Sequence, residues 1–324
     1  MRRQTALMST LPEPSAAALA GGSAGRRVKR LLLATRPKFF AASMLPVLFG
    51  TAWGYKVSGQ FDGLAFALAL MAILCIHAGA NVLNDVFDEL GGSDRINDDR
   101  IYPYTGGSRF IQNGVMSVAE MARWGSALIG LGMVLGAALF AIKGTAVLLF
   151  GLAGVALATL YSIPPVQLSA RGWGEAAVGV GFGVLPVAGA AWLQSGLLDG
   201  AVLVVSVPLS LWVANILLIN EVPDIPADGH AGKRTLAVRL GRPGTRALYF
   251  CLHVLAVLAI AVAIWQALLP WPAIVLPAVL LLAAARAARA INAGAERLKR
   301  GIELTLAIHG LGGLWLTGWA VYAA

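Results

Sequence analysis

The sequence predicts an all-α, polytopic membrane protein with nine transmembrane helices and a cytoplasmic N-terminus. Of its 324 residues, 58% are hydrophobic and 13% are charged, which is about half the charged fraction of a soluble domain. The mean hydropathy is +0.75. A helix needs about 20 mostly apolar residues to cross a bilayer, and nine such runs lie along the chain. The expected spans are 38–57, 62–84, 118–142, 144–163, 173–195, 201–222, 245–268, 270–290 and 303–323.

The distribution of basic residues predicts the orientation of these spans. When successive connections are assigned to alternate sides of the membrane, all 25 Lys and Arg residues except Lys56 and Lys143 fall on the side of the N-terminus. Basic residues accumulate on the cytoplasmic side of membrane proteins, so the N-terminus is expected inside and the C-terminus outside. Topology and attraction to anionic lipid head groups explain the net charge of +9, and no nucleic-acid partner is expected.

The chain is expected to divide into a disordered cytoplasmic tail, 1–30, and a nine-helix transmembrane domain, 31–324. The tail is rich in Ala, Ser, Gly and Pro, and its only acidic residue is Glu13. It lacks the apolar run of a secretory signal, but an Arg-rich start with few acids is also typical of an organellar transit peptide. Cys75 and Cys251 lie in separate apolar runs, so both are expected to be buried and unpaired.

Nine of the 16 acidic residues fall in two short segments that follow the second and sixth expected spans. Both segments therefore lie at the cytoplasmic face. Each begins with Asn, an acidic residue, Val, any residue and Asp, and this weak repeat indicates two related halves in parallel orientation. The alternative is a solvated loop or helix end, which is the favoured interpretation for Asp98 and Asp99. The first segment contains Asn84, Asp85, Val86, Phe87, Asp88, Glu89, Asp94, Asp98 and Asp99, and the second contains Asn220, Glu221, Val222, Pro223, Asp224 and Asp228.

The spacing of these acids favours a metal site. Asp85 and Asp88 are three residues apart, which places them on one face of a helix end. Asp224 and Asp228 are four apart, and Pro226 between them is expected to break the helix. Carboxylates at the end of an apolar span are costly unless they are paired or bind a metal. Mg²⁺ prefers a few carboxylates combined with substrate phosphates, so the two segments predict a Mg²⁺ site for a diphosphate.

A glycine-rich, basic stretch follows each acidic segment. The first ends in Gly106, Gly107, Ser108 and Arg109, and the second contains Lys233 and Arg234. Glycines let backbone N–H groups approach an anion, and the cations would neutralise phosphate oxygens. An ordinary loop is the alternative, but the pairing with an acidic segment favours phosphate binding.

With these motifs on the second and sixth spans, the sequence resembles the UbiA superfamily of intramembrane aromatic prenyltransferases over nearly the whole chain after the tail. The resemblance implies an all-helical fold of nine spans and a diphosphate and Mg²⁺ site at their cytoplasmic ends. Its implied catalytic residues are Asp85, Asp88, Asp224 and Asp228, which together with Asp94 are also its implied Mg²⁺ ligands. Its implied substrate-binding residues are Asn84, Arg109, Tyr161, Arg171, Asn220, Lys233 and Arg234.

The first motif also bears on the branch of the superfamily. Members that prenylate 4-hydroxybenzoate usually carry a further Asp four positions after the second Asp, where this chain has Gly92. Asp94, six positions after Asp88, resembles instead the 1,4-dihydroxy-2-naphthoate branch, which makes the precursor of menaquinone. Stretches 103–109, 161–165 with 171–175, and 228–241 point the same way. Related enzymes share the last stretch, so 4-hydroxybenzoate or another quinone or lipid precursor remains the alternative acceptor.

The expected activity is Mg²⁺-dependent transfer of a prenyl chain from a polyprenyl diphosphate to 1,4-dihydroxy-2-naphthoate with loss of CO₂, in a bacterial cytoplasmic membrane with the site on the cytoplasmic side. Metal and cations would stabilise the departing diphosphate, and a lipid-embedded chamber would exclude water. Tyr161, Arg171 and Glu175 are candidates for positioning the acceptor or a phosphate; interface anchoring is their alternative. A secondary transporter also uses intramembrane carboxylates, but its site lies near the midplane, not at one face.

Overall fold

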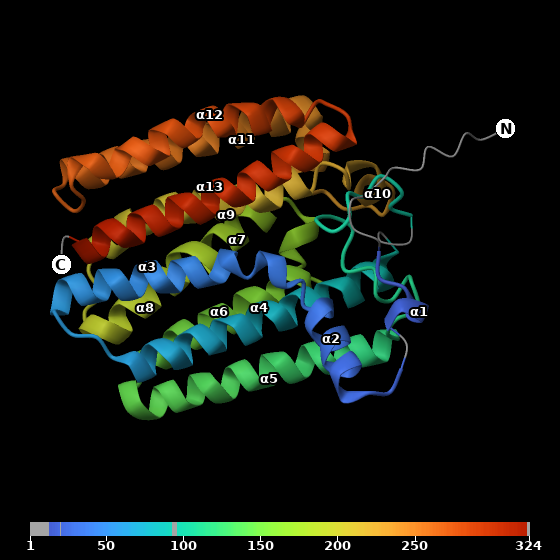
Figure 1. Ribbon diagram of the computed structural model, residues 1–324, viewed down its shortest axis with the longest axis horizontal. Coiled ribbons are helices and arrows are strands. Elements are labelled where there is room, and N and C mark those ends of the chain that lie inside the picture. Colours follow the sequence, from blue (N-terminus) through green and yellow to red (C-terminus); the bar gives the residue numbers. More distant parts are fainter. Residues whose placement is uncertain (1–12, 20, 93–95, 323–324) are drawn as a thin grey trace.

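The computed structural model describes residues 13–19, 21–92 and 96–322, and all regular structure within these ranges is helical. Figure 1 shows long helices that run side by side as a bundle. The short helices α1 (Ala16–Leu19) and α10 (Ile225–His230) lie at one end of this bundle, to the right in Figure 1, and α13 (Ala295–Tyr322) ends at the other. The remaining α-helices are α2 (Ala24–Ala34), α3 (Ala41–Ser58), α4 (Gly63–Gly91), α5 (Val118–Lys143), α6 (Ala146–Ser162), α7 (Gly174–Gly179), α8 (Leu185–Ser195), α9 (Gly200–Asn220), α11 (Leu236–Trp265) and α12 (Val275–Ala290).

Every expected span contains a helix, but the helices differ in length. Seven are long and apolar enough to cross a bilayer: α4, α5, α7 with α8, α9, α11, α12 with its preceding turn, and α13. A π-helical turn, η3 (Val180–Val184), joins α7 to α8. An eighth span would be a pair formed by α2 and α3, which are bent by 48° at a short 3₁₀ turn, η1 (Pro37–Phe39). The apolar helix α6 has only 17 residues. The membrane-spanning helical architecture is confirmed, whereas the count of nine and the cytoplasmic N-terminus stay predictions.

Helical structure begins before the expected end of the tail. The boundary at residue 30 falls inside α2, and Ser23 caps this helix by accepting a hydrogen bond from the backbone N–H of Arg26. A Ser cap together with Arg, Lys and Leu in the following turns favours a helix, a local signal that outweighs the low-complexity composition of the tail. Residues 1–12 lie outside the described ranges.

The outer helices expose large apolar side chains. Leu149 and Leu152 on α6 are 71% and 65% exposed, and Leu282 on α12 is 66% exposed. Such an apolar surface suits a lipid surrounding rather than water.

The expectation for the cysteines is half right: both are free and Cys75 is buried, but Cys251 is exposed on α11. An apolar run in a membrane helix does not imply burial, because the apolar side of the helix can face lipid.

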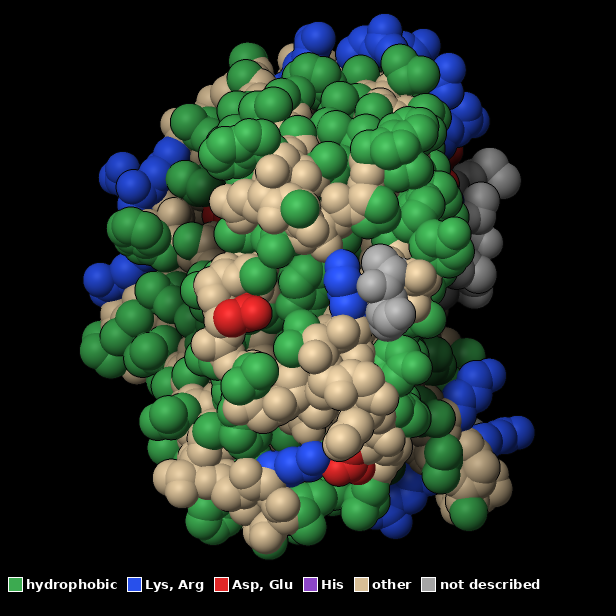
Figure 2. All heavy atoms as spheres, turned by 90° about the vertical axis from the view of Figure 1, so that its left-hand side faces the viewer, with side chains coloured by type: hydrophobic (Ala, Val, Ile, Leu, Met, Phe, Trp, Pro, Cys, Tyr) green, Lys and Arg blue, Asp and Glu red, His purple; other side chains and the backbone are tan. Residues whose placement is uncertain are grey.

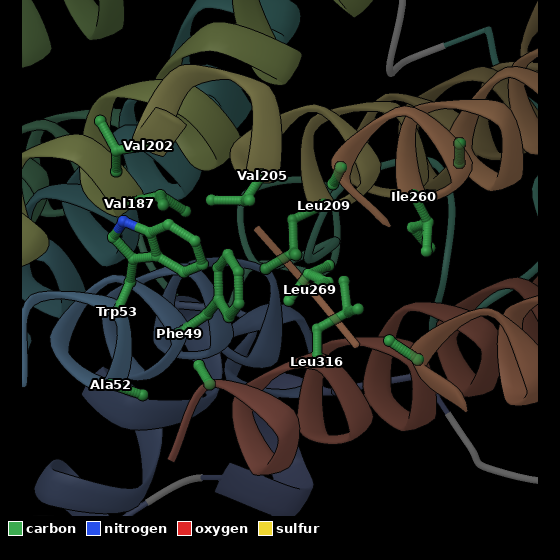
Figure 3. Close-up of a cluster of buried hydrophobic side chains, with 14 of the residues drawn as sticks. Phe49, Ala52, Trp53, Val187, Val202, Val205, Leu209, Ile260, Leu269 and Leu316 are labelled. Carbon is green, nitrogen blue, oxygen red and sulfur yellow. The ribbon is translucent and has the colours of Figure 1, made fainter. Parts of the chain in front are cut away.

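A buried apolar core connects α3, α8, α9, α11 and α13 (Figure 3). Phe49 and Trp53 of α3 pack there against Val187 of α8 and Leu209 of α9. Small residues bring α3 and α8 close together, since a Cβ atom at Gly50 would overlap the backbone of Val187. Within α9, 72% of the apolar window is buried inside the protein, compared with 22% for α5. The second acidic segment therefore follows the central helix of the bundle.

The end of the bundle opposite α10 carries few charges near its centre, as Figure 2 shows. Its charged side chains are tied to neighbouring loops: Lys143 Nζ lies 2.8 Å from a carboxylate oxygen of Asp62, and Lys56 donates to the carbonyl of Leu268. These two lysines are the ones that the sequence places apart from all other basic residues. Both of these lysines lie at the same end of the bundle, while the orientation of the chain in the membrane stays a prediction.

Candidate functional site

A cavity of about 620 Å³ lies between the helices, and its two ends differ in chemistry. Apolar side chains of α4, α5, α6 and α8 line most of its wall, among them Ile76, Phe150 and Leu185. Its other end is polar, and this polar end meets the termini of α4 and α9. The polar lining residues that belong to the two acidic segments are Asn84, Asp88, Asn220, Glu221, Asp224 and Asp228. The cavity thus suits a molecule with a long apolar part and a charged head.

The first acidic segment lies on the last turns of α4. Asn84 and Asp88 are one turn apart on the cavity side, and the Asn84 amide donates to Asp88 Oδ2 over 2.8 Å. Asp85 instead points to the neighbouring loop, where it is 3% exposed and accepts a hydrogen bond of 2.9 Å from the backbone N–H of Ser108. Arg36 Nη1 lies 3.7 Å from Asp85 Oδ1. Asp88 therefore lines the cavity, whereas Asp85 contacts Arg36 and the loop that contains Ser108.

The second acidic segment is built from a turn and a short helix. The helix α9 ends at Asn220, and α10 begins at Ile225 with Pro226 in its first turn. The expectation that Pro226 breaks a helix is wrong in detail, because proline is well tolerated in the first turn, where its missing N–H is not needed. Asp224 occupies the N-cap position of α10, but its side chain does not cap the helix and instead accepts a hydrogen bond of 2.7 Å from Asn97 Nδ2. A residue that follows the first acidic segment, Asn97, thus positions an acid of the second segment.

Lys233 joins the two acidic segments. Its Nζ lies 2.7 Å from Asp88 Oδ1 and 3.1 Å from Asp228 Oδ1. The turn at Gly232, with a φ of 78°, brings it there, and the Lys233 N–H donates to the Asp228 carbonyl. Burial alone would lower the pKa of Lys233, but the Asp88 and Asp228 carboxylates raise that pKa above its ordinary value. Lys233 is therefore charged at any physiological pH.

The second segment carries more negative charge than its cations balance. Burial, and then the neighbouring Asp228 carboxylate, raise the pKa of Asp224 to about 7. Burial also raises the pKa of Asp228, although Lys233 opposes this. A carboxyl group with such a pKa is kept partly neutral by its surroundings until a further positive charge arrives.

The donor set fits a metal ion shared with a substrate. No three His, Cys, Asp or Glu side chains in the described ranges are arranged to hold a metal by themselves. Mg²⁺, however, is typically bound by one or two carboxylates plus substrate phosphates. The amide oxygen of Asn220, at the cavity wall, is buried and has no hydrogen-bond partner in the described part of the chain, so an oxygen ligand is available beside the carboxylates. Asp94, the remaining expected ligand, lies outside the described residues.

The other expected substrate-binding residues divide into two groups. Tyr161 lines the cavity with Lys233, whereas Arg109, Arg171 and Arg234 are not part of its lining. Arg109 is buried in the loop between α4 and α5 with a φ of 64°. Arg171 is exposed and donates to the carbonyl of Pro165 over 2.6 Å. The side chain of Arg234 is also exposed. A cation beside a glycine-rich turn is thus not sufficient evidence of a place at the site.

The sequence analysis missed three residues at the polar end. Arg36 lines the cavity and was counted only for topology, although its place directly before Pro37 and the first span was a usable signal. Asn97, which holds Asp224, had no signal in the sequence. Glu221 was counted only as part of the repeat, yet it lines the cavity beside the buried Glu175. Glu175 itself is not part of the lining, and both of its carboxylate oxygens lack hydrogen-bond donors within the described ranges.

Comparison with known proteins gives a consistent result. The model of the UbiA prenyltransferase family matches residues 43–320. A 1,4-dihydroxy-2-naphthoate octaprenyltransferase of Haemophilus influenzae is 32% identical over 230 residues, which cover 67% of this chain and 70% of that protein. The enzyme of the same name from Mycobacterium tuberculosis is 31% identical over 293 residues, covering 89% of this chain and 93% of that protein.

Solved structures share the fold. A UbiA homolog from Archaeoglobus fulgidus superposes with a TM-score of 0.66 at 17% identity, covering 91% of this chain and 98% of that one. The same kind of homolog, described as bound to GPP and Mg²⁺, gives a TM-score of 0.61 at 16% identity, covering 89% and 99%. From the family match, the apolar helices and the shared fold, we conclude that the chain belongs to the UbiA prenyltransferase family and is an integral membrane prenyltransferase.

Proposed function

We propose that the protein transfers a prenyl chain from a polyprenyl diphosphate to 1,4-dihydroxy-2-naphthoate with loss of CO₂, at the cytoplasmic side of a bacterial cytoplasmic membrane. The observation that carries this proposal is a cavity that is apolar along most of its wall and joins two acidic segments at one end. The relatives from Haemophilus influenzae and Mycobacterium tuberculosis, which bear the name of this activity, support the choice of acceptor.

The polar end is the proposed diphosphate site. Lys233, already held between Asp88 and Asp228, would contact the phosphate oxygens, and Arg36, which also lines the cavity, would add a second cation. Asp88, Asp224 and Asp228 with the amide oxygen of Asn220 would hold Mg²⁺, while Asp85 keeps Arg36 in place. A bound Mg²⁺ would supply a Lewis acid that neutralises the charge on the departing diphosphate. Solved structures of a UbiA homolog from Archaeoglobus fulgidus bound to GPP or to DMAPP with Mg²⁺ support this arrangement.

The chemistry follows from where charge develops. The bond between the allylic carbon and the diphosphate oxygen breaks, and both electrons leave with the diphosphate into the field of Lys233 and Arg36. The apolar wall keeps water away from the allylic cation, which water would otherwise consume. The ring carbon of the acceptor that bears the carboxylate then forms the new carbon–carbon bond. The bond to the carboxylate breaks, CO₂ leaves, and its electron pair restores the aromatic ring.

The product mass tests this proposal. Purified protein in detergent with Mg²⁺ and a polyprenyl diphosphate is given a panel of aromatic acceptors that includes 1,4-dihydroxy-2-naphthoate and 4-hydroxybenzoate. The expected product from the naphthoate lacks one CO₂ relative to simple addition, because the attacked carbon carries the carboxyl group. With 4-hydroxybenzoate the attacked carbon carries hydrogen, so the carboxyl group would survive. A carboxyl-retaining product from 4-hydroxybenzoate, with none from the naphthoate, would overturn the acceptor while leaving prenyl transfer intact.

A further inference from the structure

An open groove of about 700 Å³ lies on the outer side of the bundle between α11 and α12, which run side by side in Figure 1. None of its lining residues belongs to the lining of the cavity at the candidate site. Arg246 on α11 and Arg289 on α12 line its two walls, and Asn292 lies just beyond the end of α12. Phe250 and Cys251 line it on the next turn of α11. The groove therefore has cations on both walls and an apolar turn beside them.

The cations of the groove have no acidic partners among the residues that the structure describes. The sequence contains no Asp or Glu between Asp228 and Glu296, and the side chains of Arg246 and Arg289 are exposed. Among the described residues, the partner of Arg289 is the backbone carbonyl of Ala285 on its own helix, to which its Nε donates. Arg242, which lies close by, has a structural role instead, because its guanidinium donates to the carbonyls of Ile291 and Ala293 after the end of α12. The groove thus holds two cations whose charge nothing in the described part of the chain balances.

The surface next to the groove faces an apolar surrounding. Phe250 follows Arg246 by four residues, so both lie on the same side of α11, one turn apart. Further along, α11 exposes Leu258 and Val262, and α12 exposes Leu282. A molecule seated with its anion between the arginines would therefore lay an apolar chain along α11. This combination of a charged head and an apolar chain is that of a membrane phospholipid.

We propose that this groove binds an anionic phospholipid of the surrounding leaflet, with its phosphate between Arg246 and Arg289 and an acyl chain against Phe250. Basic pockets between transmembrane helices are a known setting for anionic head groups. The groove lacks carboxylates that would hold Mg²⁺ beside a diphosphate, which distinguishes it from the polar end of the cavity at the candidate site. The proposal does not depend on which acceptor the enzyme prenylates.

Lipid occupancy can be measured by native mass spectrometry of the protein in neutral detergent, titrated with phosphatidylglycerol or with phosphatidylcholine of the same chains. We expect phosphatidylglycerol to bind preferentially. The double variant Arg246→Gln/Arg289→Gln should bind it about 30-fold more weakly, because each cation near a lipid surface contributes about fivefold. Arg246→Lys/Arg289→Lys keeps the charges and should retain most of the binding.

The matched control is Arg297→Gln/Arg300→Gln, which removes the same charge from exposed positions on α13 outside the groove. It should bind phosphatidylglycerol as the unchanged protein does. Cys251 gives an independent readout: its alkylation in the groove should slow on addition of phosphatidylglycerol, while buried Cys75 serves as the internal reference. Equal binding of the two lipids, equal loss in the control variant, or equal protection of Cys251 by inorganic phosphate alone would each overturn the proposal.

Discussion

The two acidic segments share a sequence pattern, but the charges of their buried carboxyl groups are balanced in different ways. Asp88 and Asp224 occupy the last position of the pattern, and both line the cavity. Asp85 and Glu221 occupy its second position, and both are buried. Asp85 is balanced by Arg36 and the N–H of Ser108. Glu221 instead lies beside a second acid.

The repeat therefore determines which position of each segment lines the cavity. The groups that neutralise the buried acids are determined by tertiary packing instead. Asp88 is held by Asn84 of its own motif, but Asp224 is held by Asn97, which lies 127 residues away in the chain. Each half therefore borrows from the other: Asn97 of the first half holds Asp224, and Lys233 of the second half pairs with Asp88. A metal ion and a diphosphate would supply the positive and bridging groups that the second half lacks.

The largest expected effect concerns the two positions that the halves share. Asp88→Asn and Asp224→Asn, made singly, should each lower the rate of prenyl transfer by about 10³-fold, because each removes a carboxyl group proposed to hold the Mg²⁺ that neutralises the departing diphosphate. Product formation in detergent, with unchanged gel-filtration behaviour as the folding control, measures this. Asp98→Asn is the matched control, since Asp98 is not part of the cavity lining. Full activity in both Asp88→Asn and Asp224→Asn would show that neither half serves catalysis.

The second expected effect is a pH dependence that belongs to the second half. The pKa of Asp224 is raised to about 7, so the group is increasingly protonated as the pH falls below 7 and must lose that proton to bind a cation. The apparent affinity for Mg²⁺ should therefore fall by up to about tenfold for each pH unit below 7 and level off above it. Calorimetric titration with Mg²⁺ at pH 6, 7 and 8 measures this, and an excess of chelator should abolish turnover.

Asp224→Asn supplies the control for this pH dependence, since it removes the titrating carboxyl group. In that variant Mg²⁺ should bind more weakly at pH 8, and the change in affinity between pH 6 and pH 8 should be smaller. A constant Mg²⁺ affinity from pH 6 to pH 8 in the unchanged protein would contradict the difference drawn between the two halves.

The sequence predicts the local features of this protein well. Apolar runs of about 20 residues identify membrane helices because the bilayer imposes a length, and acids at the ends of such runs are costly enough to be informative. These rules place Asp88, Asp224 and Asp228 at one cavity end together with Lys233. The UbiA family and the prenyltransferase activity followed from the same motifs and are confirmed by the family match.

Partners that are distant in sequence were not predictable in the same way. Arg36 reaches the cavity because the chain takes a φ of 58° there and bends between α2 and α3, and no periodicity encodes that bend. Arg109 looked like a phosphate ligand beside two glycines, yet its backbone geometry places it in the buried loop instead. Spacing along a chain predicts neighbours on one helix, whereas contacts between loops depend on packing that only the folded chain defines.

The smallest expected effect separates Asp85 from Glu221, the second positions of the repeat. Asp85→Asn leaves Arg36, whose side chain is 16% exposed, without its counter-charge. The two side chains are 3.7 Å apart and the pair is not fully buried. We therefore expect the free energy of unfolding to fall by about 2 kcal/mol, which is less than for a fully buried ion pair. Glu221→Gln keeps a hydrogen-bond donor beside the Glu175 carboxylate and removes one ionisable group of the pair. It should therefore be neutral or raise stability by up to about 1 kcal/mol. Thermal unfolding in detergent without Mg²⁺ compares the two variants, and Glu175→Gln should behave as Glu221→Gln does. If Glu221→Gln destabilised the protein as much as Asp85→Asn, the two halves would be balanced alike and the contrast between them would fail.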